Sequence, residues 1–314
     1  MARVTVVGAG VVGLTTALEL AGAGHAVQCI GDQNVLETVS AVAGGLWFPY
    51  HVDPRDRVLA WGSVALARFH DLAAEPGAGV SIREGVMVER GGADRWWTQG
   101  FSTWREADAV DLPHGAERGV VATVPIVTMP VFLPWLREKC VAAGVGIGRG
   151  VVADLAEVDA DVVVVAGGLR SPELLGLDAA GSVTPSRGQV ALLANPGLER
   201  WFVDDGHPNG MVYVLPHRDW VVCGGTDVEG TFDTAPDPAT HDGIIARARE
   251  AVPLLEGAEV LASRVGLRPV AAAVSLDASV RDGRVVITNY GHGGAGVTLS
   301  WGCAAEVVGL VGAL

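Results

Sequence analysis

The sequence is poor in cysteine and contains no CxxC pair. Its 314 residues include only four cysteines, Cys29, Cys140, Cys223 and Cys303. Each lies among apolar residues, so we interpret all four as small core residues of a protein from a reducing compartment. They share no ligand-like spacing with one another or with a histidine. This disfavours a metal site, and we predict that no metal is bound.

Basic residues are also scarce. Lys and Arg number 22 against 36 Asp and Glu, a net charge of −14. Binding to nucleic acid needs basic patches, so this balance argues against nucleic acid as a partner. It equally disfavours an anionic membrane surface, and we expect no apolar run long enough to span a bilayer.

The first 20 residues are apolar enough to resemble a secretory signal. However, Glu19 interrupts the run, and three glycines at fixed spacing explain the segment better. We therefore expect these residues to belong to the folded protein, and the protein to be cytoplasmic.

Glycine, in contrast, is abundant. The chain has 43 glycines, and 49% of its residues are hydrophobic, so a folded chain with one elaborate domain or two domains is expected. Many glycines suit a protein that brings its backbone close to a ligand at several places.

The N-terminal segment predicts a dinucleotide site. A strand over Arg3–Val7 runs into Gly8-Ala9-Gly10-Val11-Val12-Gly13, a helical pattern follows to Ala21, and residues 26–30 form a second strand. A GxGxxG motif alone is weak evidence. Between a strand and a helix, within a βαβ unit of about 30 residues, it is strong. Such glycines let the backbone approach a pyrophosphate at the helix N-terminus.

Asp32 follows the second strand, near the place of the carboxylate that binds the adenosine ribose in such units. An ordinary turn aspartate that caps the next segment is the alternative. At this point the sequence does not distinguish FAD from NAD.

The rest of the chain favours a flavin. A glycine pair, Gly44-Gly45, leads into Leu46 and Trp47, and residues 51–124 lack regular strand–helix alternation. We predict a helix over residues 61–72 and short strands over 80–83 and 86–89. The alternation of helices and strands that is typical of a parallel sheet resumes after residue 124. We predict a helix over 130–143, then Val151-Val152, then a buried strand over 161–165 that leads into Gly167.

Two further segments carry candidate site residues. Residues 211–215 and 220–223 read as an antiparallel hairpin in which Met211, Tyr213 and Leu215 share one face. A tyrosine there is usually a core residue. Near the C-terminus, a strand over 284–288 precedes a glycine-rich loop, residues 289–296, and a helix from Val297. This loop predicts a second anion site, which a reduced flavin needs and a pyrophosphate alone does not.

Together these segments resemble the D-amino acid oxidase family of flavin amine oxidoreductases along essentially the whole chain. The specific parts are Gly45-Leu46-Trp47, Tyr213-Val214-Leu215-Pro216, Val265–Val270 with its Arg-Pro pair, and Asn289–Gly302, NYGHGGAGVTLSWG. The resemblance implies an FAD-dependent oxidase. Such an enzyme takes D-amino acids and dioxygen and yields imino acids and hydrogen peroxide.

The resemblance also implies residue roles. Arg268 and Tyr213 would bind the substrate carboxylate, and the backbone carbonyl of Gly294 would accept from the amine. A planar guanidinium suits a carboxylate because it can donate two parallel hydrogen bonds. The implied FAD-binding positions are Gly8, Gly10, Val11, Val12, Gly13, Asp32, Gly44, Gly45, Leu46, Val152, Gly167, Gly293, Gly296, Val297 and Thr298.

The sequence departs from the family's pattern at the lid and at two loop positions. Eukaryotic members often carry a lid tyrosine where this chain has Asn209. Relatives that oxidise acidic substrates use arginines where this chain has Asp204 and Asp227. We therefore expect neutral D-amino acids to be preferred. None of the pocket motifs contains a Lys, Asp or Glu suited to remove the α-proton, and we interpret His292 as a residue that shapes the loop.

The implied fold is α/β. It combines a Rossmann-type FAD-binding domain (1–50, 125–185 and 266–314) with an interleaved α+β substrate-binding domain (51–124 and 186–265) on a mainly antiparallel sheet. A homodimer is the candidate assembly. The alternatives are a related amine oxidase such as a glycine oxidase, an NAD-dependent dehydrogenase, and a flavin-binding module without activity.

Overall fold

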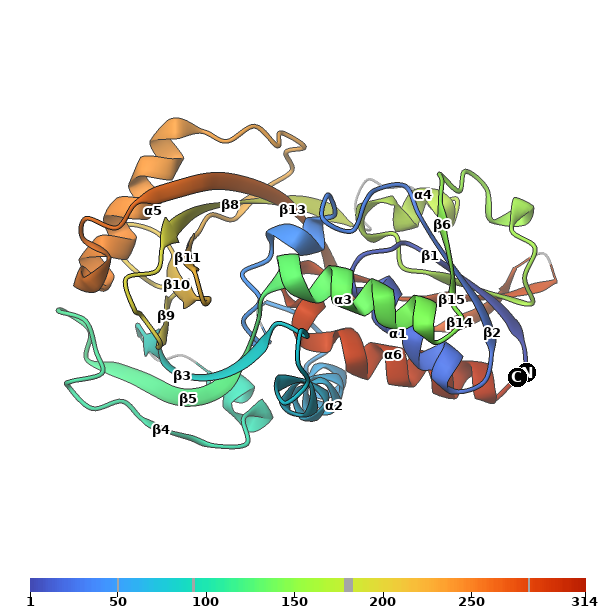
Figure 1. The fold of residues 1–314 in the computed structure, drawn as a ribbon, viewed down its shortest axis with the longest axis horizontal. Helices are drawn as coiled ribbons and strands as arrows, with labels where there is room; N and C mark the ends of the chain where they lie inside the picture. The colour runs from blue at the N-terminus through green and yellow to red at the C-terminus, as the bar shows by residue number, and fades with distance from the viewer. Residues whose placement is uncertain (50, 92–93, 178–182, 282) are drawn as a thin grey trace.

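The computed structural model describes residues 1–49, 51–91, 94–177, 183–281 and 283–314. Its strands form two sheets, which Figure 1 shows on the right and on the left of the molecule. The right-hand sheet is mostly parallel and the left-hand sheet is mostly antiparallel, so the predicted α/β fold with two kinds of sheet is confirmed.

The parallel sheet has the strand order β14-β15-β7-β1-β2-β6, and only β14 runs antiparallel to its neighbour. Valines fill β7 and all four are buried, as expected for a central strand covered on both faces. Helix α1 packs on this sheet and contacts α3 and α6. The strands are β1 (Arg3–Val7), β2 (Ala26–Gly31), β6 (Gly146–Arg149), β7 (Val162–Val165), β14 (Ala278–Arg281) and β15 (Arg284–Thr288).

The larger sheet has the order β16-β13-β8-β11-β10-β9-β3-β5-β4, with β12 paired to β8. Among its pairs in the described residues, only β3 and β9 run parallel. Its strands are β3 (Val80–Glu89), β4 (Trp104–Glu106), β5 (Arg118–Val127), β8 (Thr184–Ala194), β9 (Trp201–Asp204), β10 (Val212–Pro216), β11 (Trp220–Gly224), β12 (Val228–Glu229), β13 (Val260–Ser275) and β16 (Tyr290–His292).

Two helices lie away from the parallel sheet in Figure 1: α2 is below the junction of the two sheets, and α5 is at the left end of the molecule. The α-helices are α1 (Val11–Gly22), α2 (Arg55–Ala73), α3 (Met129–Ala142), α4 (Ser171–Leu174), α5 (Pro238–Ala251) and α6 (Gly296–Gly312). The short 3-10 helices are η1 (Val39–Val42), η2 (Trp96–Gly100), η3 (Leu155–Glu157), η4 (Gly168–Arg170), η5 (Pro253–Leu255) and η6 (Gly293–Ala295).

Three predicted elements differ from the structure. Residues 80–83 and 86–89 form one strand, β3, because Gly85 fits directly against Trp201 of β9. Helix α2 begins at Arg55, earlier than its apolar pattern indicates, since its first turn is polar. Residues 151–152 form no strand. The strand beside β2 is β6, whose alternating glycines conceal it from an apolar pattern.

The predicted domain boundaries stay a prediction. Strand β13 runs from Val260 to Ser275, across the boundary placed between residues 265 and 266. Strand β16, inside the predicted FAD-binding segment, pairs with β13 in the larger sheet. The larger sheet therefore includes residues on both sides of the predicted boundary, and Figure 1 shows β13 and β8 extending toward the parallel sheet.

The C-terminal helix corrects one expectation. Residues Gly293–Gly312 are long and apolar enough, by length and composition, to cross a membrane, so the expectation of no such run is wrong. In the structure, 61% of that apolar window is buried inside the protein, and α6 packs against α1 and α2. A buried core helix passes the same test, so the finding is weak evidence for a membrane.

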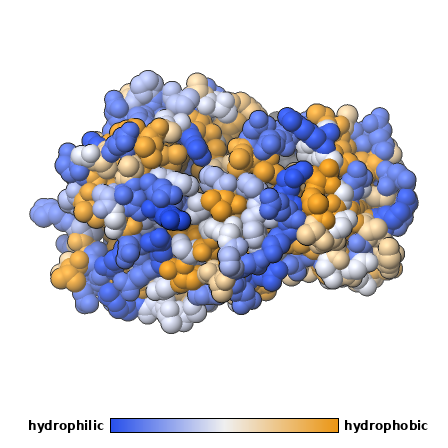
Figure 2. All heavy atoms as spheres, in the orientation of Figure 1, coloured by the Kyte–Doolittle hydropathy of each residue, from blue (hydrophilic) through white to orange (hydrophobic). Residues whose placement is uncertain are grey.

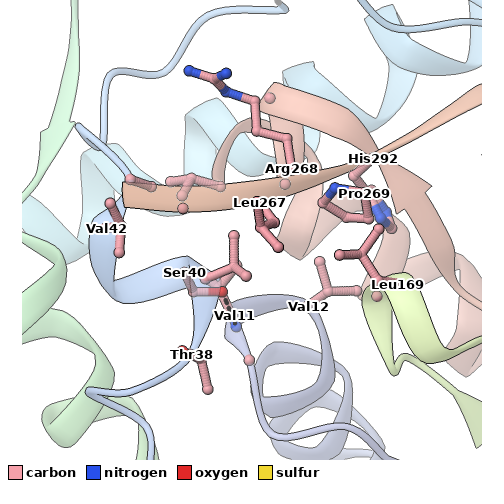
Figure 3. A pocket seen from close by; sticks show the side chains of 18 of the residues that line it. Val11, Val12, Thr38, Ser40, Val42, Leu169, Leu267, Arg268, Pro269 and His292 are labelled. Atoms are coloured by element: carbon pink, nitrogen blue, oxygen red, sulfur yellow. Dashed lines mark hydrogen bonds between the residues drawn. The ribbon is translucent and has the colours of Figure 1, made fainter. Parts of the chain in front are cut away.

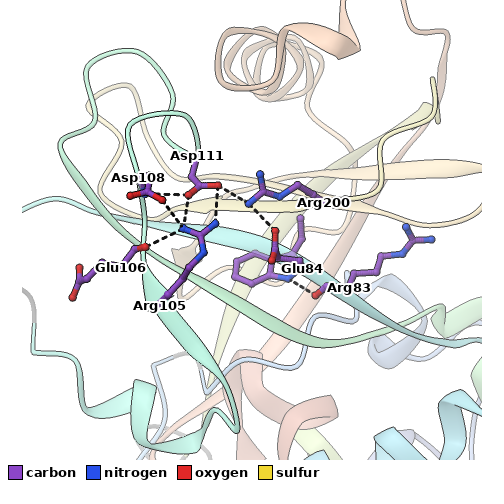
Figure 4. Close-up of polar contacts among 8 residues, drawn as sticks. Arg83, Glu84, Arg105, Glu106, Asp108, Asp111 and Arg200 are labelled. Atoms are coloured by element: carbon purple, nitrogen blue, oxygen red, sulfur yellow. Dashed lines mark hydrogen bonds and ion pairs between the residues drawn. The ribbon is translucent and has the colours of Figure 1, made fainter.

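Ion pairs secure the outer part of the larger sheet (Figure 4). Asp111 accepts hydrogen bonds from Arg105 and from Arg200, at 2.7 and 2.8 Å, and its side chain is only 3% exposed. The bond from Arg105 holds the pKa of Asp111 well below its usual value. Arg200 also pairs with Glu84 of β3 at 3.1 Å, so the network ties the segment after β4 to the sheet. Elsewhere on the face in Figure 2, apolar and hydrophilic residues are interspersed.

Candidate active site

A single long cavity of about 580 Å³ extends from the N-terminus of α1 to the β10–β11 hairpin. We call its two parts the glycine end, around Gly8, Gly10 and Asp32, and the hairpin end, around Tyr213 and Arg268. Of the predicted site residues, those that line the cavity are Gly8, Gly10, Val11, Val12, Asp32, Gly44, Gly45, Leu46, Val152, Gly167, Tyr213, Arg268, Gly293, Gly294, Gly296 and Val297.

Backbone forms much of the glycine end. Gly8 has a φ of +119°, and a Cβ atom there would lie 2.2 Å from the carbonyl oxygen of Ala166. Only glycine fits this close approach of β1 to the end of β7. Gly13 does not line the cavity. A Cβ atom on it would lie 1.8 Å from the Gly8 carbonyl oxygen, so Gly13 lets α1 pack against the turn.

Ser40 completes the N-terminus of α1, and the sequence analysis missed it. Its Oγ accepts a hydrogen bond of 3.0 Å from the backbone N–H of Val11, one of the groups that a helix leaves unpaired at its start. Figure 3 shows Ser40 beside Val11 in the cavity wall. The signal available in the sequence was the hydroxyl pair Thr38 and Ser40, just after the second strand.

Arg170 links two predicted positions at the glycine end. Its Nη1 lies 3.5 Å from the Asp32 carboxylate, and its Nη2 donates to the carbonyl oxygen of Val152 over 3.4 Å. All three residues line the cavity. The sequence analysis did not predict Arg170, because this residue, at the end of η4, belongs to no recognised motif.

Thr298 lies outside the cavity wall. Its Oγ1 accepts from the backbone N–H of Phe48 at 3.0 Å and donates to the Phe48 carbonyl oxygen at 2.8 Å. These bonds fix the segment after Gly44-Gly45 to the first turn of α6. The structure thus gives the Thr298 side chain a positioning role, and contact of its backbone with a flavin stays a prediction.

Arg268 lies in β13 at the hairpin end, and Figure 3 shows its side chain extending away from the N-terminus of α1. Its Nη1 donates to the carbonyl oxygen of Thr226 at 2.9 Å and lies 3.7 Å from the Asp227 carboxylate. The side chain packs across Gly188, where a Cβ atom would come within 2.5 Å of the guanidinium. Arg268 is therefore held in one place, with 19% of its side chain exposed.

Tyr213 lines the cavity together with Arg268, as the resemblance implied. Its ring packs against Gly224, the residue opposite it in β11, where a Cβ atom would clash with the ring. Burial raises the pKa of Tyr213, although the positive charge of Arg268 and a hydrogen bond donated by its guanidinium oppose the shift. The phenol is therefore protonated at neutral pH and can donate.

Asp204 ends β9 and Asp205 follows it, and only Asp205 lines the cavity, which corrects the expectation that Asp204 lies at the substrate. Asp204 is fully buried and accepts hydrogen bonds from Arg90, with a shortest distance of 2.7 Å. Its neighbour Asp205 lines the cavity, on the face of Val203 and Tyr213. The resemblance matched Asp204 to a loop position of the relatives, one residue away from the residue that lines the cavity.

Asp205 is a cavity-lining carboxylate that the sequence analysis did not predict, because it lies in none of the pocket motifs. Burial raises its pKa from 3.8 to about 6, while His51 opposes the shift and Asp204 and Asp227 add to it. Asp205 is half-buried, and within the described chain it makes no ion pair and no side-chain hydrogen bond.

The glycine-rich loop before α6 presents polar atoms without partners. Both Asn289 and His292 line the cavity. The buried atoms His292 Nε2 and Asn289 Oδ1 have no hydrogen-bond partner among the described residues. Burial lowers the pKa of His292 to about 4, so the imidazole is neutral at pH 7. Buried polar atoms are normally satisfied, so these atoms fit a polar ligand lying along the loop. A flavin dinucleotide meets that requirement.

Known proteins share this architecture and sequence. A family model described as FAD dependent oxidoreductase matches residues 3–310. A D-amino-acid oxidase of Rubrobacter xylanophilus is 41% identical over all of this chain and 97% of its own. One of Streptomyces coelicolor is 42% identical over 98% and 96%, and a human D-aspartate oxidase is 32% identical over 99% and 94%.

Among solved structures, a glycine oxidase from Bacillus cereus superposes with a TM-score of 0.82 at 19% identity, covering all of this chain and 95% of that one. At this identity the likeness concerns the fold alone.

The chain thus belongs to the FAD dependent oxidoreductase family, and its cofactor is FAD. Its predicted resemblance to the D-amino acid oxidases is confirmed by the two bacterial relatives. The glycine end, with Ser40 and Arg170, is the part of the cavity suited to the dinucleotide. Asn289 and His292 lie along the path toward the hairpin end.

Proposed function

We propose that this chain oxidises neutral D-amino acids to imino acids, which then hydrolyse to 2-oxo acids and ammonia, while dioxygen is reduced to hydrogen peroxide. One observation carries the proposal: Arg268 and Tyr213, from separate strands, meet at one end of the cavity whose other end is the dinucleotide motif. The names of the two bacterial relatives point to the same activity.

Arg268 and Tyr213 would bind the substrate carboxylate. The guanidinium is already oriented by Thr226, and the Tyr213 phenol keeps its proton, so both groups can donate to an anion. Binding at two points fixes the position of Cα relative to the cavity wall. The carbonyl of Gly294, which also lines the cavity, would accept from the substrate amine.

When bound, FAD would supply the two-electron redox chemistry of this oxidation, in which the α-hydrogen leaves as hydride and dioxygen is the final electron acceptor. The residues of the chain would therefore contribute position and electrostatics. His292 is neutral and buried in the loop, which suits it to shape the cavity and not to carry charge.

The purified protein should be yellow, with FAD that is released on denaturation. One spectrum before and one after anaerobic addition of D-alanine tests the activity, since the oxidised flavin bands should bleach and return with air. A peroxide assay with D-valine and D-alanine, against glycine and sarcosine, separates this activity from that of a glycine oxidase. A protein that stays oxidised with every D-amino acid would be a flavin-binding protein without this activity.

Neutral D-amino acids should be better substrates than D-aspartate and D-glutamate. The cavity wall contains Arg268 as the cation at the hairpin end, and Asp205 and Asp227 lie nearby. A second substrate carboxylate would meet like charge there, which is unfavourable. A kcat/KM for D-aspartate equal to that for D-valine would contradict this preference. A cytoplasmic location and a homodimer stay predictions.

A further inference from the structure

Asp205 is the one charged residue of the hairpin end, within the described chain, for which the structure shows no ion pair and no side-chain hydrogen bond. The other charged residues of the cavity wall are Asp32, Glu37, Arg170 and Arg268. Asp32 and Arg170 pair with each other at the glycine end, and Arg268 interacts with Thr226 and Asp227.

The cavity lining places Asp205 near Tyr213. Val203 is opposite Tyr213 in the β9–β10 pair, and both residues line the cavity. Asp205 is the first residue after β9, two residues beyond Val203, and it lines the same cavity. Met211, two residues before Tyr213, also lines this wall. A substrate whose carboxylate lies at Arg268 and Tyr213 would extend its side chain along these residues.

The charges at this end favour a cation. When a substrate carboxylate binds, Arg268 faces two anions, that carboxylate and Asp227 at 3.7 Å, so its own charge is compensated. Asp205 has no such compensation beyond His51, and Asp204 and Asp227 add negative charge around it. A half-buried carboxylate without a partner is unfavourable, and a cationic group of the ligand would satisfy it.

We propose that Asp205 is a specificity-determining residue that binds the positively charged side chain of basic D-amino acids, so that the enzyme accepts D-arginine and D-lysine besides neutral substrates. This proposal rests on the proposed D-amino acid oxidation and names a substrate class for the same cavity. Arg268 binds the substrate carboxylate, and Asp205 binds the distal ammonium or guanidinium.

The test uses substrate pairs of matched length on the holoenzyme at pH 8, where Asp205 is ionised. D-arginine is compared with D-citrulline, and D-lysine with D-norleucine, in the wild type and in Asp205→Asn. The wild type should have the higher kcat/KM for the cationic member of each pair. Asp205→Asn should lower that advantage by about 10-fold to 100-fold, mainly through KM, because a hydrogen bond to a charged group is lost. The loss with D-valine should be smaller than the loss with either cationic substrate, because D-valine has no distal charge to bind.

Two further variants serve as controls. Asp205→Glu keeps the charge and should retain the preference for cations. Asp219→Asn removes a carboxylate in the hairpin turn, 75% exposed, and should change neither substrate pair. Retained flavin absorbance and a cooperative thermal unfolding transition would show that each variant is folded.

Three results would overturn the proposal. One is a wild type that does not prefer the cationic member of either pair. Another is an Asp205→Asn variant that keeps the wild-type preference. The third is an equal loss on cationic and neutral substrates, which would place Asp205 at the α-ammonium group. Failure to oxidise D-alanine, D-valine or any other D-amino acid would instead refute the proposed function itself.

Discussion

The two ends of the cavity are built in different ways. At the glycine end, close contacts of backbone and one helix N-terminus form the wall, with Ser40 and Arg170 as additions. At the hairpin end, side chains from β13 and β10 and from the segment after β9 converge, and each depends on the register of its strand.

The difference shows which parts of a site tolerate change. A backbone site depends on the absence of side chains, so any Cβ atom damages it. A side-chain site depends on the charge and hydrogen bonds of a few groups, so its residues can be exchanged one at a time to alter substrate choice. The four predictions below test this contrast.

The largest effect is expected from Arg268→Ala. Loss of a charge-assisted pair that leaves the partner charge buried costs about 2–5 kcal/mol, so KM should rise strongly and kcat should fall. Steady-state kinetics with D-alanine measure the loss, and the flavin spectrum should stay that of the wild type. Arg218→Ala, at a side chain 94% exposed, is the matched control. An Arg268→Ala variant with wild-type kcat/KM would remove the carboxylate site from this end.

Gly8→Ala should weaken FAD binding. The φ of +119° and the 2.2 Å approach to the Ala166 carbonyl both oppose a Cβ atom, a strain on the order of 1–3 kcal/mol. Titration of the apoprotein with FAD, followed by flavin fluorescence, measures the change in Kd. Gly24→Ala is a sharp control because φ there is +85° but a Cβ atom would meet nothing within 4 Å. If both variants bound FAD equally weakly, the loss would come from backbone strain alone and not from the Cβ contact in the cavity. A wild-type Kd for Gly8→Ala would contradict the prediction.

Tyr213→Phe should have a smaller effect, about 0.5–1.5 kcal/mol in kcat/KM, since one neutral hydrogen bond is lost. The phenol also interacts with Arg268, so the two changes should not be additive. A double-mutant cycle with Arg268→Ala measures this coupling. Losses of equal size from the two single changes would mean that the carboxylate clamp is misassigned.

The sequence predicted the glycine end better than the hairpin end, and the reason is physical. Gly8, Gly10 and Val11 are local in sequence, and a βαβ unit has one geometry, so spacing alone predicted their place. The hairpin end required the pairing of β9 with β10, which no local pattern contains. The alternation within one hairpin correctly grouped Tyr213 with Met211 and Leu215, which all line the cavity. The match to relatives, in contrast, selected Asp204, and the residue that lines the cavity is its neighbour Asp205.

Arg170 and Ser40 show a second limit. Both lie in short 3-10 segments, η4 and η1, whose course depends on the tertiary packing around them. Strand β6 was missed for a related reason, since its glycines carry no β signal and its pairing with β2 defines it. Long-range pairing, and not residue type, decided each of these positions.

The smallest effect concerns the stability of the protein as a function of pH. The pKa of Asp205 is about 6 in the folded protein against 3.8 for an ordinary aspartate, so between these values the folded state keeps a proton that the unfolded state releases. Stability therefore falls as pH rises through this window, and above pH 6 the ionised carboxylate is a constant cost. Asp205→Asn removes that cost.

The variant should be more stable than the wild type at pH 7 by about 0.5–1 kcal/mol, once the partial exposure of the side chain to solvent is taken into account. The gain should vanish below about pH 4, where the wild-type carboxyl is also protonated. Thermal unfolding of both proteins at pH 4, 5, 6 and 7 measures the difference, with Asp219→Asn as the exposed control. A gain that is the same at pH 4 and pH 7 would come from packing and not from the charge. A loss of stability at pH 7 would mean that a cationic partner already compensates Asp205 without substrate.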